Sequence, residues 1–372
     1  MPQIAMIAGL GMVADYPIAG TCAMYENQCR ARRTQRGANS LCPLALIGLS
    51  PPDRLDRRSP QEFRENRQLS ATTRKREEDQ VYSVYRQAGR ISAIDPTRTS
   101  AAMTAATTVM PTRDVTIGDT FVRISGQGFP LVFVHGFTTT SEFWREQAEE
   151  FSKAYRVIRI NLPGHGASPA PTSRGYCLED FVEDVARVFR ELSIDKAVLI
   201  GLSMGGIVAQ KFALKYQHLV KALVLVDTTS HGIGPDATAD AFLAIADKRG
   251  LKQAVQDLSD ISFSSSASPV LLEWARREVI QTPEFVARAA VRSLNDADTR
   301  GSLSQIKVPT LVTAGEEDLV TPPQESEILA KGISDSTLSL IPGAGHFSML
   351  ENPVAFNRIL RRFLDGLPRG AS

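Results

Sequence analysis

From about residue 111 onward, the chain alternates between short apolar runs and longer amphipathic stretches. Continuous apolar runs are typical of strands that are buried on both faces of a parallel sheet. Stretches in which apolar residues recur every three or four positions predict helices that pack on such a sheet. The alternation of the two patterns therefore predicts an α/β protein with helices on both faces of the sheet. Strands are predicted at 120–124, 131–134, 157–160, 197–200 and 222–226, and an amphipathic helix at 178–192.

The alternation stops between residues 228 and 301. This segment contains several helical patterns and no convincing strand. The strand pattern resumes at 308–312 and 337–341. We therefore predict a helical cap at 228–301 that is inserted into an α/β core formed by 111–227 and 302–368.

Residues 1–110 have a different composition. They contain 15 Lys and Arg residues against 10 Asp and Glu residues, and their hydrophobic periodicity is poor. This combination predicts a largely disordered N-terminal extension. Met103 and Met110 stand where the regular pattern begins, so an over-long gene start is a second interpretation of the same segment. The first residues lack a basic n-region, so we expect no secretory signal peptide and a cytoplasmic protein.

The composition of the whole chain argues against several kinds of partner. The formal net charge is +1 over 372 residues, which gives no reason to expect binding to nucleic acid or to an anionic membrane surface. No apolar run approaches the ~20 residues that span a bilayer. The four cysteines form no disulfide framework and fit no zinc-binding spacing, so we expect no metal site.

The segment 201–206 reads GLSMGG and lies between a predicted strand and a predicted helix. A strand that turns into a helix within one residue holds that residue in strained dihedral angles, and the flanking glycines let the helix fold back over the strand. The turn lifts the hydroxyl of Ser203 out of the sheet and places it beside the first N–H groups of the helix. The pattern therefore predicts a nucleophilic serine.

A serine hydroxyl becomes an effective nucleophile only when a neighbouring base takes its proton. Among the five histidines, His346 lies in a glycine loop after the last predicted strand. Loops of this kind gather at the carboxyl edge of a parallel sheet, where Ser203 is also predicted. His346 is therefore the predicted base, and His231, which also follows a strand, is its rival. We expect His135 and His165, which stand beside glycines, to make structural hydrogen bonds.

An acid on the same edge must orient the base. The segment 316–318 follows a predicted strand and offers three carboxylates, and Asp227 at the end of the preceding strand is an alternative. Backbone N–H groups must also stabilise the oxyanion that develops during acyl transfer. We expect them from Met204, at the start of the helix, and from the loop at 135–137.

Five motifs in order closely resemble those of the α/β-hydrolase superfamily: FVHGF, NLPGHGAS, GLSMGG, AGEEDLVTP and GAGHFSMLENP. The resemblance implies an eight-stranded, mostly parallel sheet with a cap inserted after the sixth strand. A serine at the elbow departs from the dehalogenase and epoxide-hydrolase branches. The site residues that the resemblance implies are Ser203 as nucleophile, His346 as base, Asp318 as acid, and Phe137 and Met204 as oxyanion donors.

Within that superfamily, GLSMGG followed by VLVDTT looks most like the enol-lactonases and haloperoxidase-type esterases. The implied function is hydrolysis of a small carboxylic ester or lactone through an acyl-enzyme, without a cofactor. A carbon–carbon hydrolase of ring-cleavage dienes is an alternative, although residues 137–140 replace the glycine-rich stretch usual in that group. A non-catalytic small-molecule binding protein on the same fold is a further alternative. For the assembly, we consider a homodimer. The residues expected to line the substrate pocket are His135, Gly136, Trp144, Phe242, Trp274 and Phe347.

Overall fold

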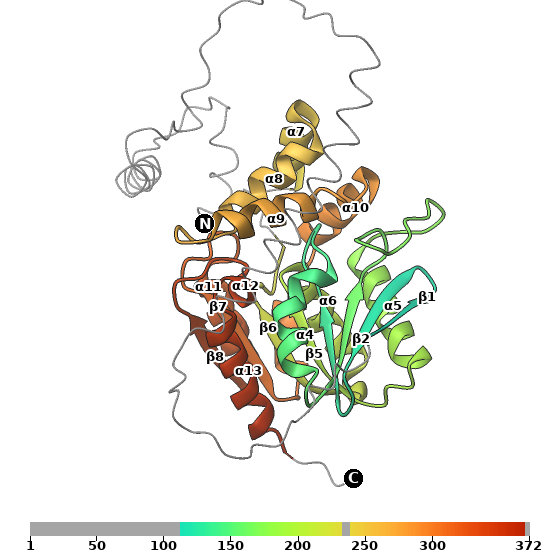
Figure 1. Ribbon diagram of the computed structural model, residues 1–372, viewed down its shortest axis with the longest axis vertical. Coiled ribbons are helices and arrows are strands. Elements are labelled where there is room, and N and C mark those ends of the chain that lie inside the picture. Colours follow the sequence, from blue (N-terminus) through green and yellow to red (C-terminus); the bar gives the residue numbers. More distant parts are fainter. Residues whose placement is uncertain (1–111, 233–238, 369–372) are drawn as a thin grey trace, which may run out of the picture. The chain divides into compact units, whose positions relative to one another are not determined.

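A computed structural model describes residues 112–232 and 239–368 (Figure 1). The extension 1–110, for which the sequence predicts disorder, lies outside the described residues. The described part carries an eight-stranded sheet. Its strands are β1 (Arg113–Ile117), β2 (Thr120–Ser125), β3 (Pro130–Val134), β4 (Arg156–Asn161), β5 (Ala197–Leu202), β6 (Val220–Val226), β7 (Thr310–Gly315) and β8 (Ser336–Ile341).

The strands lie in the order β1-β2-β4-β3-β5-β6-β7-β8. β2 pairs antiparallel with β1 and with β4, whereas all neighbours from β4 to β8 are parallel. The predicted fold class, a mostly parallel α/β-hydrolase sheet, is therefore confirmed. The chain order reverses around β3, because β4 lies on one side of it and β5 on the other. In open sheets of this kind, ligands bind beyond the carboxyl ends of the strands at such a reversal.

Helices and short 3-10 turns connect the strands. Those of the core are η2 (Ser141–Trp144), α4 (Arg145–Phe151), α5 (Leu178–Glu191), α6 (Met204–Lys215), η3 (Gln217–Leu219), η4 (Arg300–Gln305), α11 (Pro323–Gly332), α12 (Ser348–Glu351) and α13 (Pro353–Gly366). Between β6 and η4 lie α7 (Ala239–Arg249), α8 (Leu251–Ile261), α9 (Pro269–Val279) and α10 (Glu284–Asn295).

Both faces of the sheet are covered by apolar side chains, which explains the continuous apolar runs in the strands. Along β3, Val132 and Val134 belong to one hydrophobic cluster and Leu131 and Phe133 to the other. The first cluster includes side chains of α5, α6 and α11, and the second includes those of α4 and α13. Burying one such side chain completely stabilises the fold by roughly 1.5–3 kcal/mol, so the two layers hold the strand ends in fixed positions.

The helices α7 to α10 gather at one end of the sheet (Figure 1). The C-terminal end of α8 meets the loop after β8, where the N–H of His346 donates to the carbonyl oxygen of Ser262 at 2.6 Å. The helices therefore stand over the carboxyl ends of the strands. None of the helices in the described ranges has the length and apolar character needed to cross a membrane.

Candidate active site

Ser203 occupies the turn between β5 and α6. Its backbone has φ +51° and ψ −118°, a left-handed conformation that residues with a side chain rarely adopt. The residues on either side, Leu202 and Met204, are buried, whereas Ser203 is half-buried. The turn therefore leaves the serine accessible at the end of a fully buried strand, where it lines a cavity.

Two glycines make this turn possible. A Cβ at Gly201 would lie 2.2 Å from the carbonyl oxygen of Gly205, and a Cβ at Gly205 would lie 2.4 Å from that of His135. The helix α6 therefore packs directly on backbone at the ends of β5 and β3. A Cβ added at Gly136 would lie 3.2 Å from the Cβ of Ser203, so the loop after β3 runs beside the serine.

His346 and Asp318 form a buried pair. Nδ1 of His346 donates to Oδ2 of Asp318 at 2.9 Å, and the two side chains are 5% and 0% exposed. The carboxylate also accepts the N–H of Val320 and the N–H and hydroxyl of Thr321 at 2.8, 3.0 and 2.9 Å. Burial lowers the pKa of His346, but the attraction to Asp318 and their hydrogen bond outweigh it and raise the pKa above its ordinary value. Because Nδ1 is engaged, Nε2 is the ring nitrogen that can take up a proton.

Asp227, the alternative acid, lies at the end of β6, and the described structure contains no hydrogen bond between it and His346. Its Oδ1 accepts the N–H of Gly315 at 2.9 Å, and its Oδ2 accepts the N–H and hydroxyl of Ser348 at 3.1 and 2.7 Å. Burial and the neighbouring Asp318 carboxylate raise the pKa of Asp227 well above its ordinary value. The geometry pairs His346 with Asp318, and Asp227 links the loops that carry these two residues.

The loop after β3 is fixed through one carbonyl oxygen, that of Gly136. Nδ1 of His135 lies 2.8 Å from this oxygen, and the hydroxyl and N–H of Thr139 donate to it at 3.0 and 3.3 Å. Thr138 has φ +53° and donates its hydroxyl to the carbonyl oxygen of Phe137 at 2.8 Å. These bonds hold the peptide N–H of Phe137 in one orientation.

His135 and His165 make the structural hydrogen bonds expected of them. Nε2 of His135 accepts the N–H of Leu162 at 3.0 Å, and Nδ1 of His165 donates to the carbonyl oxygen of Pro163 at 3.1 Å. The two rings lie 4.9 Å apart between centroids. Burial lowers the pKa of His135 well below its ordinary value and lowers that of His165 to about 4. Both imidazoles are therefore neutral near pH 7.

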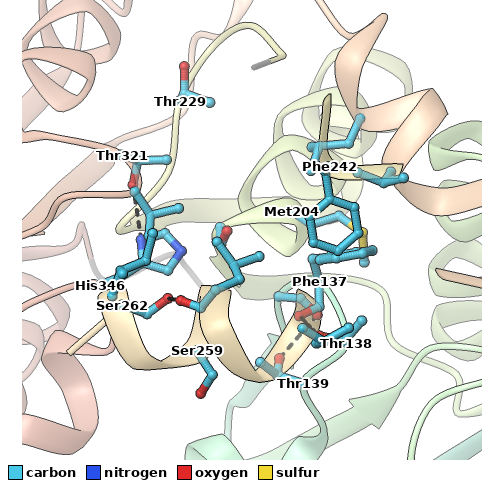
Figure 2. A pocket seen from close by; sticks show the side chains of 18 of the residues that line it. Phe137, Thr138, Thr139, Met204, Thr229, Phe242, Ser259, Ser262, Thr321 and His346 are labelled. Carbon is cyan, nitrogen blue, oxygen red and sulfur yellow. Dashed lines mark hydrogen bonds between the residues drawn. The ribbon is translucent and has the colours of Figure 1, made fainter. Parts of the chain in front are cut away.

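Ser203 and His346 line the same cavity, which has a volume of about 110 Å³. Figure 2 shows His346 on one side of this cavity, with Phe137 and Phe242 facing it. The rings of Phe137 and Phe242 meet edge to face, with their centroids 5.8 Å apart. Apolar side chains of the cap helices complete the wall: Val255, Leu258, Val279, Val291 and Leu294.

Among the predicted pocket residues, Gly136, Phe242 and Phe347 line the cavity, but three others do not. Trp144 is 0% exposed and packs on Phe133 within the core, with ring centroids 5.1 Å apart. Trp274 is stacked under the guanidinium of Arg145, whose carbon lies 4.0 Å from the ring centroid. His135 turns both ring nitrogens to backbone groups.

Sequence reasoning did not assign two residues that surround His346. Thr321 brings its hydroxyl within 3.2 Å of Nδ1 of His346 (Figure 2). Its position three residues after Asp318, from which a hydroxyl can reach back, was an available signal. Ser262 accepts the N–H of His346 from the end of the cap helix α8, and no local pattern marks it. In residues 112–232 and 239–368, no cluster of three or more His, Cys, Asp or Glu side chains could hold a metal ion.

Comparisons with known proteins agree with the fold. The family model for the alpha/beta hydrolase fold matches residues 130–353. The 3-oxoadipate enol-lactonase 2 of Acinetobacter baylyi is 29% identical over 240 residues, which cover 63% of this chain and 89% of that protein. The solved enol-lactonase from Burkholderia xenovorans has a TM-score of 0.63 and 26% identity, covering 68% of this chain and 100% of that one. A thermophilic esterase from Thermogutta terrifontis has a TM-score of 0.62 and 30% identity, covering 69% and 99%. Because the family model matches more than half of the chain, the protein belongs to the α/β-hydrolase family.

Proposed function

We propose that this α/β-hydrolase cleaves a small carboxylic ester or lactone through an acyl-enzyme on Ser203. One observation carries the proposal: the buried Asp318–His346 hydrogen bond lies at the same cavity that Ser203 lines. A carboxylate on Nδ1 fixes the tautomer of the imidazole and leaves Nε2 to accept the serine proton. A binding protein has no need of such a pair next to a strained serine.

In the first half of the proposed reaction, Nε2 of His346 takes the proton of Ser203 as Oγ attacks the substrate carbonyl carbon. The Asp318 carboxylate stabilises the resulting imidazolium. The tetrahedral intermediate then expels the alcohol oxygen, which receives the proton from His346. In a lactone this oxygen stays tethered to the acyl group, so the ring opens and the hydroxyl end remains attached.

In the second half, a water molecule attacks the acyl carbon while His346 again takes the proton. The bond to Oγ of Ser203 then breaks, Oγ recovers the proton from His346, and the carboxylic acid leaves. The negative charge on the carbonyl oxygen in both halves is assigned to the N–H groups of Phe137 and Met204. Met204 is the first residue of α6, whose initial N–H groups have no partner within the helix. Removing one such donor typically costs about 10²–10³ in rate.

The choice of ester or lactone is supported by the relatives, since an enol-lactonase and a thermophilic esterase are among the similar solved structures. The cavity agrees with a small substrate, because it is about 110 Å³ and is walled mostly by apolar side chains. A vinylogous diketone, the substrate type of carbon–carbon hydrolases, serves as the competing substrate in the test below.

The test compares Ser203→Ala with Ser193→Ala. Both serines have φ +51°, but Ser193 is exposed and lies outside the cavity, so the control repeats the substitution at a residue with the same positive φ. On p-nitrophenyl butyrate and a five-membered lactone, Ser203→Ala should lose about 10⁴–10⁶ in rate and Ser193→Ala should keep full activity. A burst of p-nitrophenol should mark the acyl-enzyme. Retention of more than a tenth of the activity by Ser203→Ala, or turnover of the diketone alone, would contradict the proposal.

A further inference from the structure

A second polar cluster lines the cavity where the cap joins the core. It consists of Thr229 and His231, which follow β6, and Glu325, which lies in the first turn of α11. Oε2 of Glu325 accepts the hydroxyl of Thr229 at 2.8 Å and lies 2.9 Å from Nε2 of His231. The side chains of His231 and Glu325 are 24% and 14% exposed. We call these three residues the polar corner.

Thr229 places the polar corner at one end of the cavity. Figure 2 shows Thr229 beyond Thr321 and His346, on the side away from Ser259. Among the described residues, most of the other lining side chains are apolar, and none is a lysine or an arginine. A substrate group that extends from the reacting carbonyl toward Thr229 therefore meets charged groups only when it reaches the corner.

The hydrogen bonds determine where the protons of the corner lie. Nδ1 of His231 is 2.8 Å from the carbonyl oxygen of Gly232, which can only accept, so Nδ1 carries a proton. Nε2 of His231 faces Oε2 of Glu325 at 2.9 Å. The start of α11 favours a negative charge on Glu325.

The charges around the pair offset each other. Asp298 lies next to the polar corner, because its backbone forms an isolated antiparallel bridge with that of His231. Arg300 follows two residues later. These two side chains form their own ion pair, with Nη2 and Oδ2 2.6 Å apart. The net charge presented by the surroundings is therefore small, and the direct contacts of Glu325 decide what the corner can bind.

The donors of the polar corner already face acceptors within it. The hydroxyl of Thr229 and Nδ1 of His231 are used in the bonds described above, and Nε2 of His231 faces Oε2 of Glu325. Within residues 112–232 and 239–368, no donor contacts the other carboxylate oxygen of Glu325, Oε1. The corner therefore offers a substrate one charged acceptor and no unused side-chain donor.

We infer that the substrate carries a hydrogen-bond donor, a hydroxyl or an ammonium group, on the part that extends toward the polar corner. The inference rests on the proposed ester or lactone hydrolysis and specifies its substrate class. A donor forms a charge-assisted hydrogen bond with Oε1 of Glu325. A methyl group in the same place leaves that oxygen desolvated without a partner, and a carboxylate meets a like charge with no donor to receive it.

The test uses two matched series of esters at pH 7.5, because either side of the ester bond can extend toward the corner. The first series is p-nitrophenyl esters of hexanoic, 6-hydroxyhexanoic, 6-aminohexanoic and adipic acid, the last as its monoester. The second series is acetates of hexanol that end in methyl, hydroxyl, ammonium or carboxylate. In at least one series, kcat/KM for a donor-ended ester should exceed that of the methyl-ended ester by about 10- to 100-fold. The carboxylate-ended ester should be the poorest substrate.

The double variant His231→Phe/Glu325→Leu removes both polar side chains together, so neither is left without its partner in the cavity. Its ratio of kcat/KM between donor-ended and methyl-ended esters should fall to about one. The single variant Glu325→Gln separates the two donors, because a neutral amide oxygen still accepts a hydroxyl but no longer attracts an ammonium group. The control is Glu327→Gln on the same helix, whose exposed carboxylate pairs with Lys331 at 3.0 Å. The control should keep the wild-type ratio.

Binding to the Ser203→Ala protein, measured as the rise in Tm with each ester, reports recognition without turnover. The same order of esters is expected. If the wild type hydrolyses no ester but the binding order holds, the proposed function fails and the recognition of donors stands. If hydrolysis is normal and both assays show no preference for donors, or a preference for the carboxylate, the inference about the corner is wrong while the proposed function survives. A double variant that keeps the wild-type ratio would also overturn it.

Discussion

The carboxylate of Glu351 accepts the N–H of Gly345 at 2.8 Å, one residue before His346. Its other oxygen accepts the N–H of Ser264 at 2.8 Å, in the segment that follows the cap helix α8. His346 itself donates its N–H to the carbonyl oxygen of Ser262. The loop that carries His346 is therefore fastened to the cap as well as to the sheet, and Glu351 bridges the two.

Replacing this bridge should loosen the His346 loop. In Glu351→Gln only one oxygen remains to accept, and the amide nitrogen faces an N–H group that it cannot satisfy. Hydrogen bonds to charged groups contribute about 1.5–3 kcal/mol, so we expect Tm to fall by about 5 °C. Because a small misplacement of a reacting group is costly, kcat/KM on p-nitrophenyl butyrate should fall by about tenfold.

The control for Glu351 is Glu149→Gln in α4, which makes the same change at an exposed position. Both variants are measured by thermal unfolding and by ester hydrolysis in parallel. If Glu351→Gln matches the control in both Tm and kcat/KM, the two hydrogen bonds do not position His346.

The two carboxylates near His346 should differ sharply in their effect on rate. Asp318→Asn removes the acceptor that fixes the tautomer of His346, so kcat/KM should fall by about 10³–10⁴. Asp227→Asn disturbs only the loops that carry Gly315 and Ser348, and should cost about tenfold. Both variants are assayed on one activated ester at equal concentrations of folded protein. A crippled Asp227→Asn with a nearly normal Asp318→Asn would mean that the acid is misassigned.

The same pair predicts the pH dependence of the reaction. His346 must be neutral to take the serine proton, and the Asp318 carboxylate raises its pKa above the ordinary value. Activity should therefore fall as the pH drops through a pKa above about 6.5. In Asp318→Asn the attraction is gone, so the acid limb of kcat/KM should move to lower pH while the maximum rate falls. An acid limb that stays in place would argue that another group titrates there.

The strands that lie inside the sheet were predictable because their sequence pattern depends only on burial. β1 was not, because four of its five residues, Arg113 to Thr116, are exposed or half-buried at the edge of the sheet, and no apolar run marks it. The predicted strand at 308–312 is displaced to β7, Thr310–Gly315. Its pairing with β8 begins only at Thr310, just after Pro309, whose nitrogen cannot donate to a strand ladder.

The site was predictable where chemistry is encoded locally. Ser203 lies within a six-residue motif. His346 lies in a glycine loop after a predicted strand, and a parallel sheet places such loops at its carboxyl edge. The polar corner could not be found in this way, because Thr229 and Glu325 are 96 residues apart and meet only through packing of α11. The prediction that Trp144 lines the pocket was wrong for a related reason: a large aromatic residue packs equally well in a core and in a pocket wall.

His165 should make the protein sensitive to acid. Its ring is fully buried, Nδ1 donates to the carbonyl oxygen of Pro163, and Nε2 has no hydrogen-bond partner in the described part of the chain. Burial lowers the pKa of His165 to about 4, below the value of about 6.5 expected in the unfolded chain. As the pH falls, the unfolded state therefore binds the proton first. The stability present above pH 6.5 is lost progressively toward pH 4.

At pH 4.5 this difference amounts to about 2–3 kcal/mol for one histidine. His165→Asn keeps an N–H group for Pro163 but cannot titrate, so it should be less stable than the wild type at pH 7 and yet lose less stability on acidification. Urea unfolding at pH 7.0 and pH 4.5 measures both proteins, and the other titrating groups, including His135, are common to the two. The wild type should lose about 2–3 kcal/mol more than the variant between these pH values. Equal losses would show that the imidazole of His165 is protonated in the folded protein without a penalty, which would be incompatible with its burial.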